Sequence, residues 1–182
     1  MTGWWVRTSR RIACLVLAGM TGVVGHAQTG VSPGDETALR RLLPAAHHFA
    51  LVEDDTRHFR AYAAPEAGRP LRVVGLAFFT TDLTPRIYAY KGRITTLVAL
   101  DTGGRVLGVD VVHHYEPFGY FSIDLPGFPR QFAGKSVLEP FDVGRDIDAV
   151  SRATITVEAA TRAIRQGARR LAREFAAAQA LP

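Results

Sequence analysis

The fold of this chain is decided by Ile94-Thr-Thr-Leu-Val-Ala-Leu-Asp-Thr-Gly-Gly-Arg-Val-Leu-Gly-Val-Asp-Val-Val-His113. Two runs of aliphatic and β-branched residues, Ile94–Leu100 and Arg105–His113, have the composition of β-strands. Between them, Asp101–Gly104 reads Asp-Thr-Gly-Gly, which suits a tight turn that requires positive φ angles. The stretch therefore predicts a β-hairpin.

Further strands and a short helix are expected on the N-terminal side of this hairpin. Arg72–Thr81 is β-branched and aromatic, which predicts a buried strand. Phe59 and Tyr62 suggest another strand before it. Nearer the N-terminus, Asp35 is predicted to cap a short helix that Pro44 ends.

The C-terminal segment predicts an amphipathic helix. Its apolar residues recur every three or four positions, as one buried helix face requires, at Val157, Ala160, Ile164, Ala168, Leu171 and Phe175. Four arginines fall elsewhere on the helical wheel and are interpreted as a solvated surface: Arg162, Arg165, Arg169 and Arg173. We therefore expect an α+β fold, in which this helix packs on one face of a twisted antiparallel sheet.

Composition and charge exclude several classes of protein. The chain has 182 residues, 47% of them hydrophobic and 21% charged, which fits one globular domain and not a disordered or fibrous chain. The formal net charge of +5 owes much to the first 27 residues, because the remainder holds 19 basic and 17 acidic residues. We therefore expect no nucleic-acid binding. No cysteine follows Cys14, which excludes disulfides, cysteine-ligated metal sites and covalently attached c-type haem in a mature chain.

Residues 1–27 have the organisation of an export signal. Three arginines form a basic region, and Ile12–Gly25 is an apolar run of about 14 residues, shorter than the about 20 that a membrane span needs. Gly25-His26-Ala27 then places small residues at the cleavage positions. We expect a periplasmic or otherwise exported protein, which an uncleaved segment would tether to the inner membrane.

The segment Asp148-Ala-Val-Ser-Arg-Ala-Thr-Ile-Thr156 leads into the C-terminal helix. The first amides of a helix lack internal partners and carry the positive end of the helix dipole, so a phosphate is stabilised there. Ala153 is small enough to let a phosphate approach the backbone, and the Thr154 hydroxyl offers a point of esterification. Helix capping is the alternative role of Ser151, Thr154 and Thr156.

The run from Asp148 to Thr154 resembles the flavinylation signature of FMN-binding domains: Asp, two variable positions, Ser/Thr, Gly/Ser, Ala and Thr. Such domains occur in subunits of Rnf-type and sodium-translocating NADH:quinone reductases and in NosR-type regulators. In these families a flavin transferase attaches FMN through its phosphate to the final threonine, which corresponds to Thr154. Arg152 stands where the families most often have glycine or serine, and it either restricts the loop or pairs with the phosphate.

A second resemblance involves the hairpin and the residues beside it. The stretch from Ile94–Asp101 through Gly108–Pro117 resembles the NosR-type domain, whose hairpin ends in His-His-Glu-Pro, with Tyr115 inserted here between His114 and Glu116. Tyr90-Lys-Gly92 resembles a family turn that contains Tyr and Gly. The resemblance covers about residues 70–175. It implies a set of cofactor-binding residues: Tyr90, His113, His114, Glu116, Pro117, Asp148, Ser151, Arg152, Ala153, Thr154 and Thr156.

Residues Tyr115–Pro129 contain many aromatic residues, prolines and glycines. We predict a long loop without regular structure, followed by a short helix from Pro129 through Phe132. Five aromatic side chains in this loop either stack on or shield a flavin ring or pack in the core and as a lid: Tyr115, Phe118, Tyr120, Phe121 and Phe128.

His113, His114 and Glu116 also raise the question of a metal site or a general base. Adjacent histidines on a strand point to opposite faces, and no third ligand has suitable spacing. No nucleophile partner for a histidine base is visible either. We therefore predict neither metal ligation nor catalysis by these residues.

These inferences divide the chain into a signal or anchor (1–27), a linker with a short helix and strand (28–69), and an FMN-binding domain (70–182). The preferred hypothesis is an exported electron carrier with covalent FMN, which exchanges electrons with a membrane quinone or respiratory complex, or another carrier, and is not an enzyme in its own right. One alternative is a sensory or assembly module of a respiratory system with the same fold. Another is a small exported domain without flavin. The flavin hypothesis requires Thr154 and the aromatic loop to face one cleft.

Overall fold

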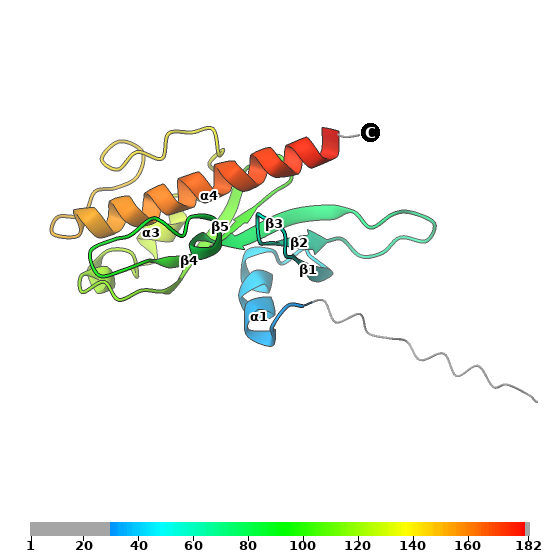
Figure 1. Ribbon diagram of the computed structural model, residues 1–182, viewed down its shortest axis with the longest axis horizontal. Coiled ribbons are helices and arrows are strands. Elements are labelled where there is room, and N and C mark those ends of the chain that lie inside the picture. The colour runs from blue at the N-terminus through cyan, green and yellow to red at the C-terminus, as the bar shows by residue number, and fades with distance from the viewer. Residues whose placement is uncertain (1–29, 181–182) are drawn as a thin grey trace, which may run out of the picture.

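The structure, a computed structural model, describes residues 30–180, so the expected export signal lies outside the described residues. Five antiparallel strands form one sheet in the order β1-β2-β3-β4-β5 (Figure 1). The strands are β1 (His48–Val52), β2 (His58–Tyr62), β3 (Val73–Phe79), β4 (Thr95–Leu100) and β5 (Val106–His113). The helices are α1 (Pro33–Leu42), α2 (Thr80–Leu83), the 3-10 turn η1 (Gly119–Phe121), α3 (Gly127–Arg130) and α4 (Thr154–Ala180).

The hairpin predicted for the centre of the domain is confirmed. β4 and β5 pair antiparallel, with Val98 opposite Val109. In the turn, Gly104 has a φ of +79°, and the Asp101 carboxylate accepts hydrogen bonds from the amides of Gly103 (2.9 Å) and Arg105 (2.8 Å). The aspartate therefore fixes the turn, and the glycine supplies a backbone conformation that other residues rarely adopt.

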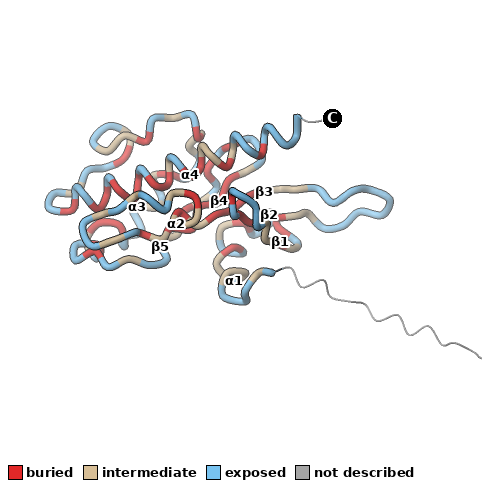
Figure 2. The backbone as a smooth tube through the Cα atoms, in the orientation of Figure 1, coloured by how far each residue is buried: buried red, intermediate tan, exposed pale blue. Residues whose placement is uncertain are grey.

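α4 covers one face of the sheet, as Figure 1 shows. All six apolar residues predicted to form its stripe are buried. Gly167 permits the closest approach, because a Cβ atom there would lie only 2.3 Å from Cε2 of Phe78 in β3. The buried side of the helix faces the strands and its exposed side faces solvent (Figure 2). The predicted α+β fold, with the C-terminal helix packed on the sheet, is confirmed.

α1 packs against the opposite face and closes a second, smaller core. Leu39 and Leu43 of this segment are buried, and Gly75 in β3 leaves room for them, because a Cβ there would lie 2.7 Å from Cδ2 of Leu43. The predicted cap was wrong: Ser32 is the N-cap, and its Oγ accepts a hydrogen bond from the Asp35 amide at 3.1 Å. Because Pro33 suits the first position of a helix, the helix begins earlier than predicted.

The region around Phe59 contains two strands, one more than predicted. β1 and β2 form a hairpin in which Leu51 lies opposite Phe59, and β2 pairs with β3 in the same sheet. Histidines and charged residues break the alternation of apolar and polar residues in this region, so the sequence pattern identified only β2.

The long loop after β5 is more regular than predicted. It contains η1, in which the Ser122 amide donates to the Gly119 carbonyl (2.9 Å). The short helix predicted from Pro129 begins earlier, as α3, with Pro126 at its N-cap position. Both elements are single turns held by local hydrogen bonds, which a reading based on proline and glycine content does not detect.

The arginines of α4 are not all solvated, so that prediction was wrong for two of the four. Arg165 donates to the carbonyl of Pro140 (2.9 Å), and Arg169 donates to those of Val137 and Glu139 (both 2.8 Å). Together they attach the segment 137–142 to the helix. Within residues 30–180, no helix has both the length and the apolar character needed to cross a membrane.

Candidate functional site

The candidate site is the start of α4. The Val157 amide donates to the Ala153 carbonyl (2.9 Å), so Ala153 is the N-cap of a helix of 27 residues. An alanine side chain cannot accept a hydrogen bond. Among the described residues, no acceptor forms a hydrogen bond with the amides of Thr154, Ile155 and Thr156. None of the hydroxyl groups considered as helix caps performs that role here, and the helix start remains available to an anion.

The residue before the cap has a left-handed backbone. Arg152 has a φ of +69°, and the following Ala153 amide donates to the Val150 carbonyl (3.0 Å). Glycine adopts this conformation without steric cost, whereas other residues do so at a penalty. This backbone conformation suits glycine at this position of the signature, whereas serine carries a Cβ atom as arginine does. The Arg152 side chain is exposed and lines the neighbouring cleft.

A cleft of about 390 Å³ opens directly over this helix start. Thr154 is exposed within it, whereas Ala153 and Thr156 are buried. Seven residues line the cleft: Tyr90, Phe118, Arg152, Ala153, Thr154, Ile155 and Thr156. The expectation that Thr154 and the aromatic loop face one cleft is confirmed for Phe118. Tyr90 adds a second ring from the β3–β4 connection.

The aromatic residues of the long loop divide between the two roles considered for them. Phe118 is 41% exposed and lines the cleft, and Phe128 is buried in the larger core. Phe121 is half-buried and packs against the same core. Tyr115 and Tyr120 are largely exposed and lie outside the cleft lining. One ring of the five is therefore placed to contact a ligand.

Glu116 is buried beneath the cleft and joins three segments of the chain. Its carboxylate accepts hydrogen bonds from the amides of Tyr90 (3.2 Å) and Lys91 (2.7 Å). It also accepts one from the Thr156 hydroxyl (2.7 Å), in the first turn of α4. Groups of the protein itself therefore supply the hydrogen bonds that the carboxylate needs. Through them, Glu116 connects the aromatic loop, the Tyr90 turn and the helix.

His114 holds the backbone of this region. Its Nδ1 accepts from the Glu116 amide (3.0 Å), and its Nε2 lies 2.8 Å from Asp124 Oδ1. The ring leaves no room for a side chain at Gly119, where a Cβ would lie 2.2 Å from His114 Cε1. His114 thereby links two points of the aromatic loop, Glu116 and Asp124, on either side of Phe118.

The remaining residues expected to bind a cofactor do not line the cleft. His113 is exposed and packs edge-on against Tyr115, at 4.7 Å between ring centroids. Pro117, Asp148 and Ser151 are also exposed. In the part of the chain that the structure describes, no three His, Cys, Asp or Glu side chains gather where they could hold a metal ion.

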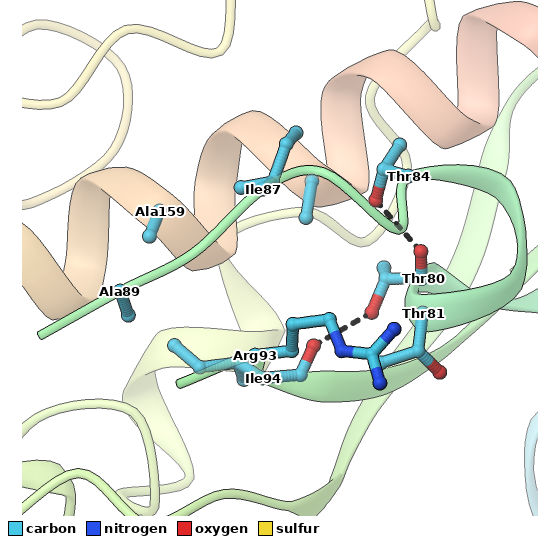
Figure 3. Close-up of a pocket in the computed structure, with 9 residues that line it drawn as sticks. Thr80, Thr81, Thr84, Ile87, Ala89, Arg93, Ile94 and Ala159 are labelled. Carbon is cyan, nitrogen blue, oxygen red and sulfur yellow. Dashed lines mark hydrogen bonds between the residues drawn. The ribbon is translucent and has the colours of Figure 1, made fainter. Parts of the chain in front are cut away.

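Two other hollows differ from this cleft in size or in lining. One, between α2, the Arg93–Ile94 segment and α4, has a free volume of only about 10 Å³, and its Thr80 hydroxyl donates to the Ile94 carbonyl (2.9 Å; Figure 3). It is a packing gap and cannot hold a small molecule. A groove of about 540 Å³ beside Leu138 and Arg169 is larger, but no aromatic ring lines it.

Comparison with known proteins identifies the domain. Residues 89–169 match the family described as the FMN-binding domain. They begin just before the Tyr90 turn and include Glu116, Thr154 and most of α4. This part of the chain belongs to the FMN-binding domain family.

A curated relative carries the same resemblance over more of the chain. It is a subunit of the ion-translocating oxidoreductase complex of Cereibacter sphaeroides, and it is 32% identical to this chain over 148 residues. The match covers 71% of this chain and 64% of the relative, so the present chain spans less than two thirds of the relative's length.

The residues of the cleft fit FMN. The volume lies within the roughly 300–1,000 Å³ typical of small-molecule sites. Tyr90 and Phe118 offer aromatic surfaces for a planar ring system, and the helix start with Arg152 offers amides and a positive charge for a phosphate. The cleft thus provides separate surfaces for the apolar and the anionic part of the molecule.

Two contributors to the site were not found from the sequence. Ile155 follows the signature threonine and lines the cleft, and Lys91 contributes its amide to Glu116. The exposure of Ile155 could have been predicted, because this residue lies outside the apolar stripe of the helix. The contact of Lys91 uses the backbone alone, so residue identity gives no indication of it.

Proposed function

We propose that this chain is an exported electron-transfer protein whose FMN is joined through its phosphate to the Thr154 hydroxyl. The observation that carries the proposal is the uncapped start of α4, where unpaired amides and an exposed threonine open into one aromatic-lined cleft. A phosphate ester at Thr154 would have its anionic oxygens near these amides, where the helix dipole stabilises negative charge.

Attachment is a phosphoryl transfer from a flavin dinucleotide, performed by a flavin transferase. A bond forms between Thr154 Oγ1 and the phosphorus of the FMN half, the phosphoanhydride bond breaks, and a nucleoside monophosphate leaves. The hydroxyl proton passes to a base, which we assign to the transferase. Because Thr154 is exposed, the transferase can reach it without unfolding the helix.

The residues around Thr154 have distinct roles in this proposal. Ala153 lets the phosphate approach the backbone, Arg152 neutralises its charge, and Tyr90 and Phe118 cover the ring system. Bound FMN would supply the redox chemistry, while the protein holds and shields it. A covalent link also prevents loss of the cofactor in a compartment where free FMN is scarce.

The proposed setting is a respiratory membrane. The name of the curated relative, which places it in an ion-translocating oxidoreductase complex, supports a membrane redox complex as the partner. The basic and apolar organisation of residues 1–27 supports export to the periplasm, with the domain either released or kept at the inner membrane. Electrons would pass between that complex, or another carrier, and the flavin of this domain.

The test is expression of the full chain with an active flavin transferase, followed by denaturation and washing. We expect the flavin absorption to remain with the denatured protein and peptide mapping to place the added mass on Thr154. Expression without the transferase should give colourless protein, and a second flavinylated domain expressed alongside shows that the transferase works. Unmodified Thr154 in the presence of that active transferase would refute the proposal.

A further inference from the structure

Glu116 is the one buried carboxylate that contacts the start of α4 among the residues that the structure describes. The residue is 6% exposed, and its two oxygens receive three hydrogen bonds, from two backbone amides and one hydroxyl. Carboxylates are rarely buried unless such donors replace water, because removing an ion from water is costly. The carboxylate that the sequence suggested as a cofactor ligand is therefore occupied by contacts within the protein.

The two threonines of the first turn stand in opposite situations. Thr154 is exposed in the cleft, and its hydroxyl has no hydrogen-bond partner among the described residues. Thr156 is 2% exposed, and its hydroxyl donates to Glu116. The lining of the cleft includes both residues, so something must distinguish the acceptor hydroxyl from its neighbour.

We propose that Glu116 is a positioning residue: its carboxylate holds the Tyr90–Lys91 turn against the first turn of α4, which forms one wall of the cleft and withholds Thr156 as an acceptor. This inference rests on the proposed attachment of flavin at Thr154. It assigns Glu116 no contact with the flavin and no part in the transfer of the phosphoryl group.

Only a carboxylate satisfies all three donors. Oε2 accepts from the Tyr90 amide and the Thr156 hydroxyl, and Oε1 accepts from the Lys91 amide. Glutamine would place an NH₂ group opposite one of the two backbone amides, whichever way its amide is turned. The Glu116→Gln variant should therefore lose one of these contacts, and Glu116→Ala should lose all three.

The backbone of Glu116 is held as firmly as its side chain. Its amide donates to His114, which is in turn 2.8 Å from Asp124, and its carbonyl accepts from the Gly119 amide (3.2 Å). The carboxylate therefore projects from a backbone that is itself held by hydrogen bonds, as a positioning residue requires.

Asp146 provides a matched control. Its carboxylate also joins loop segments, accepting from the amides of Phe141 and Asp142 and pairing with Lys135 Nζ at 3.2 Å. Burial alone would raise the pKa of this carboxyl, but these amides and the ammonium lower it below the usual value. None of these residues lines the cleft, so Asp146→Ala disturbs a comparable network away from the site.

The first experiment is amide hydrogen exchange of the full chain without flavin. We expect Glu116→Ala to raise the exchange rates of the Tyr90 and Lys91 amides about tenfold or more, and Glu116→Gln to raise one of them. Asp146→Ala should leave both exchange rates equal to those of the wild-type protein. Unchanged protection of Tyr90 and Lys91 in Glu116→Ala would overturn the inference, whether or not flavin is ever attached.

The second experiment measures attachment with the flavin transferase and flavin adenine dinucleotide. We expect Glu116→Ala to lower the extent of attachment about tenfold, Glu116→Gln to be intermediate and Asp146→Ala to match the unmodified sequence. Residual flavin in Glu116→Ala should be more fluorescent, because the Tyr90 ring no longer covers it. Equal losses in Glu116→Ala and Asp146→Ala would overturn the inference. Flavin attached to Thr156 of the wild-type chain would overturn it too. Failure of the wild-type chain to acquire flavin would instead refute the proposed function.

Discussion

The two long helices of this domain begin in opposite ways. α1 starts with Ser32, whose hydroxyl oxygen accepts from the Asp35 amide at 3.1 Å, and it has two acids in its first turn, Asp35 and Glu36. α4 starts with Ala153, which has no side-chain acceptor, and its first turn contains no acid. In the shorter helix, α1, a side chain therefore accepts a hydrogen bond from an amide of the first turn. In the longer helix, α4, the first amides have no acceptor among the described residues.

This difference shows that capping and anion binding are alternatives for the same backbone amides. An oxygen from the protein stabilises the isolated domain but occupies the position a phosphate would take. At α1 the protein supplies that oxygen. At α4 the hydroxyl of the first helical residue, Thr154, is exposed in a cleft, and the hydroxyl of Thr156 is bound to Glu116. The predictions below change one helix start at a time.

The largest effect is expected from Thr154→Ala, which removes the proposed acceptor. Covalent flavin should disappear completely, because the remaining hydroxyl of the turn is held by Glu116. The free energy of unfolding of the flavin-free protein should change by less than about 0.5 kcal/mol, since Thr154 is an exposed surface residue. Absorption of the denatured protein and urea unfolding measure the two quantities. Thr154→Ser, which restores a hydroxyl, should recover part of the flavin.

A second large effect is expected from Ile155→Glu, which gives α4 the acid that α1 already has. Ile155 is 58% exposed and lines the cleft, so the charge needs no burial. The carboxylate should stabilise the flavin-free protein by about 0.3–1 kcal/mol and oppose a phosphate at the same amides. Attachment of flavin should fall several-fold. Ile155→Gln has a similar shape without the charge, and if it lowers attachment equally, repulsion is not the cause.

The contrast between the two helix starts could be only partly predicted from the sequence. The signature from Asp148 to Thr154 indicated where a phosphate would bind, and the periodicity after Val157 indicated the helix itself. Whether hydroxyl groups cap the helix depends on side-chain directions and distances, which sequence spacing does not determine. The role of Glu116 was also hidden, because its partners are 25 to 40 positions away along the chain.

The reverse experiment, Ser32→Ala, removes the cap from α1. It should cost about 1 kcal/mol of unfolding free energy, since the Asp35 amide loses its acceptor in the first turn. Attachment of flavin should remain as in the unmodified sequence, because α1 lies on the face of the sheet opposite to α4. Urea unfolding and the absorption assay together test this separation. A loss of flavin without a loss of folding would mean that the two helix starts are coupled.

The smallest effect concerns Arg152, the left-handed residue before α4. Arg152→Gly should stabilise the flavin-free protein by about 0.5–1 kcal/mol, because relief of the unfavourable φ of +69° outweighs the added freedom of the unfolded chain. Arg152→Ala removes the same guanidinium but keeps a Cβ, so its stability should stay close to that of the unmodified sequence. The difference between the two variants, measured by urea unfolding, isolates the backbone contribution. If the guanidinium pairs with the phosphate, both variants should lower flavin attachment equally. A loss confined to Arg152→Gly would show that a restrained loop, and not the charge, favours attachment at this helix start.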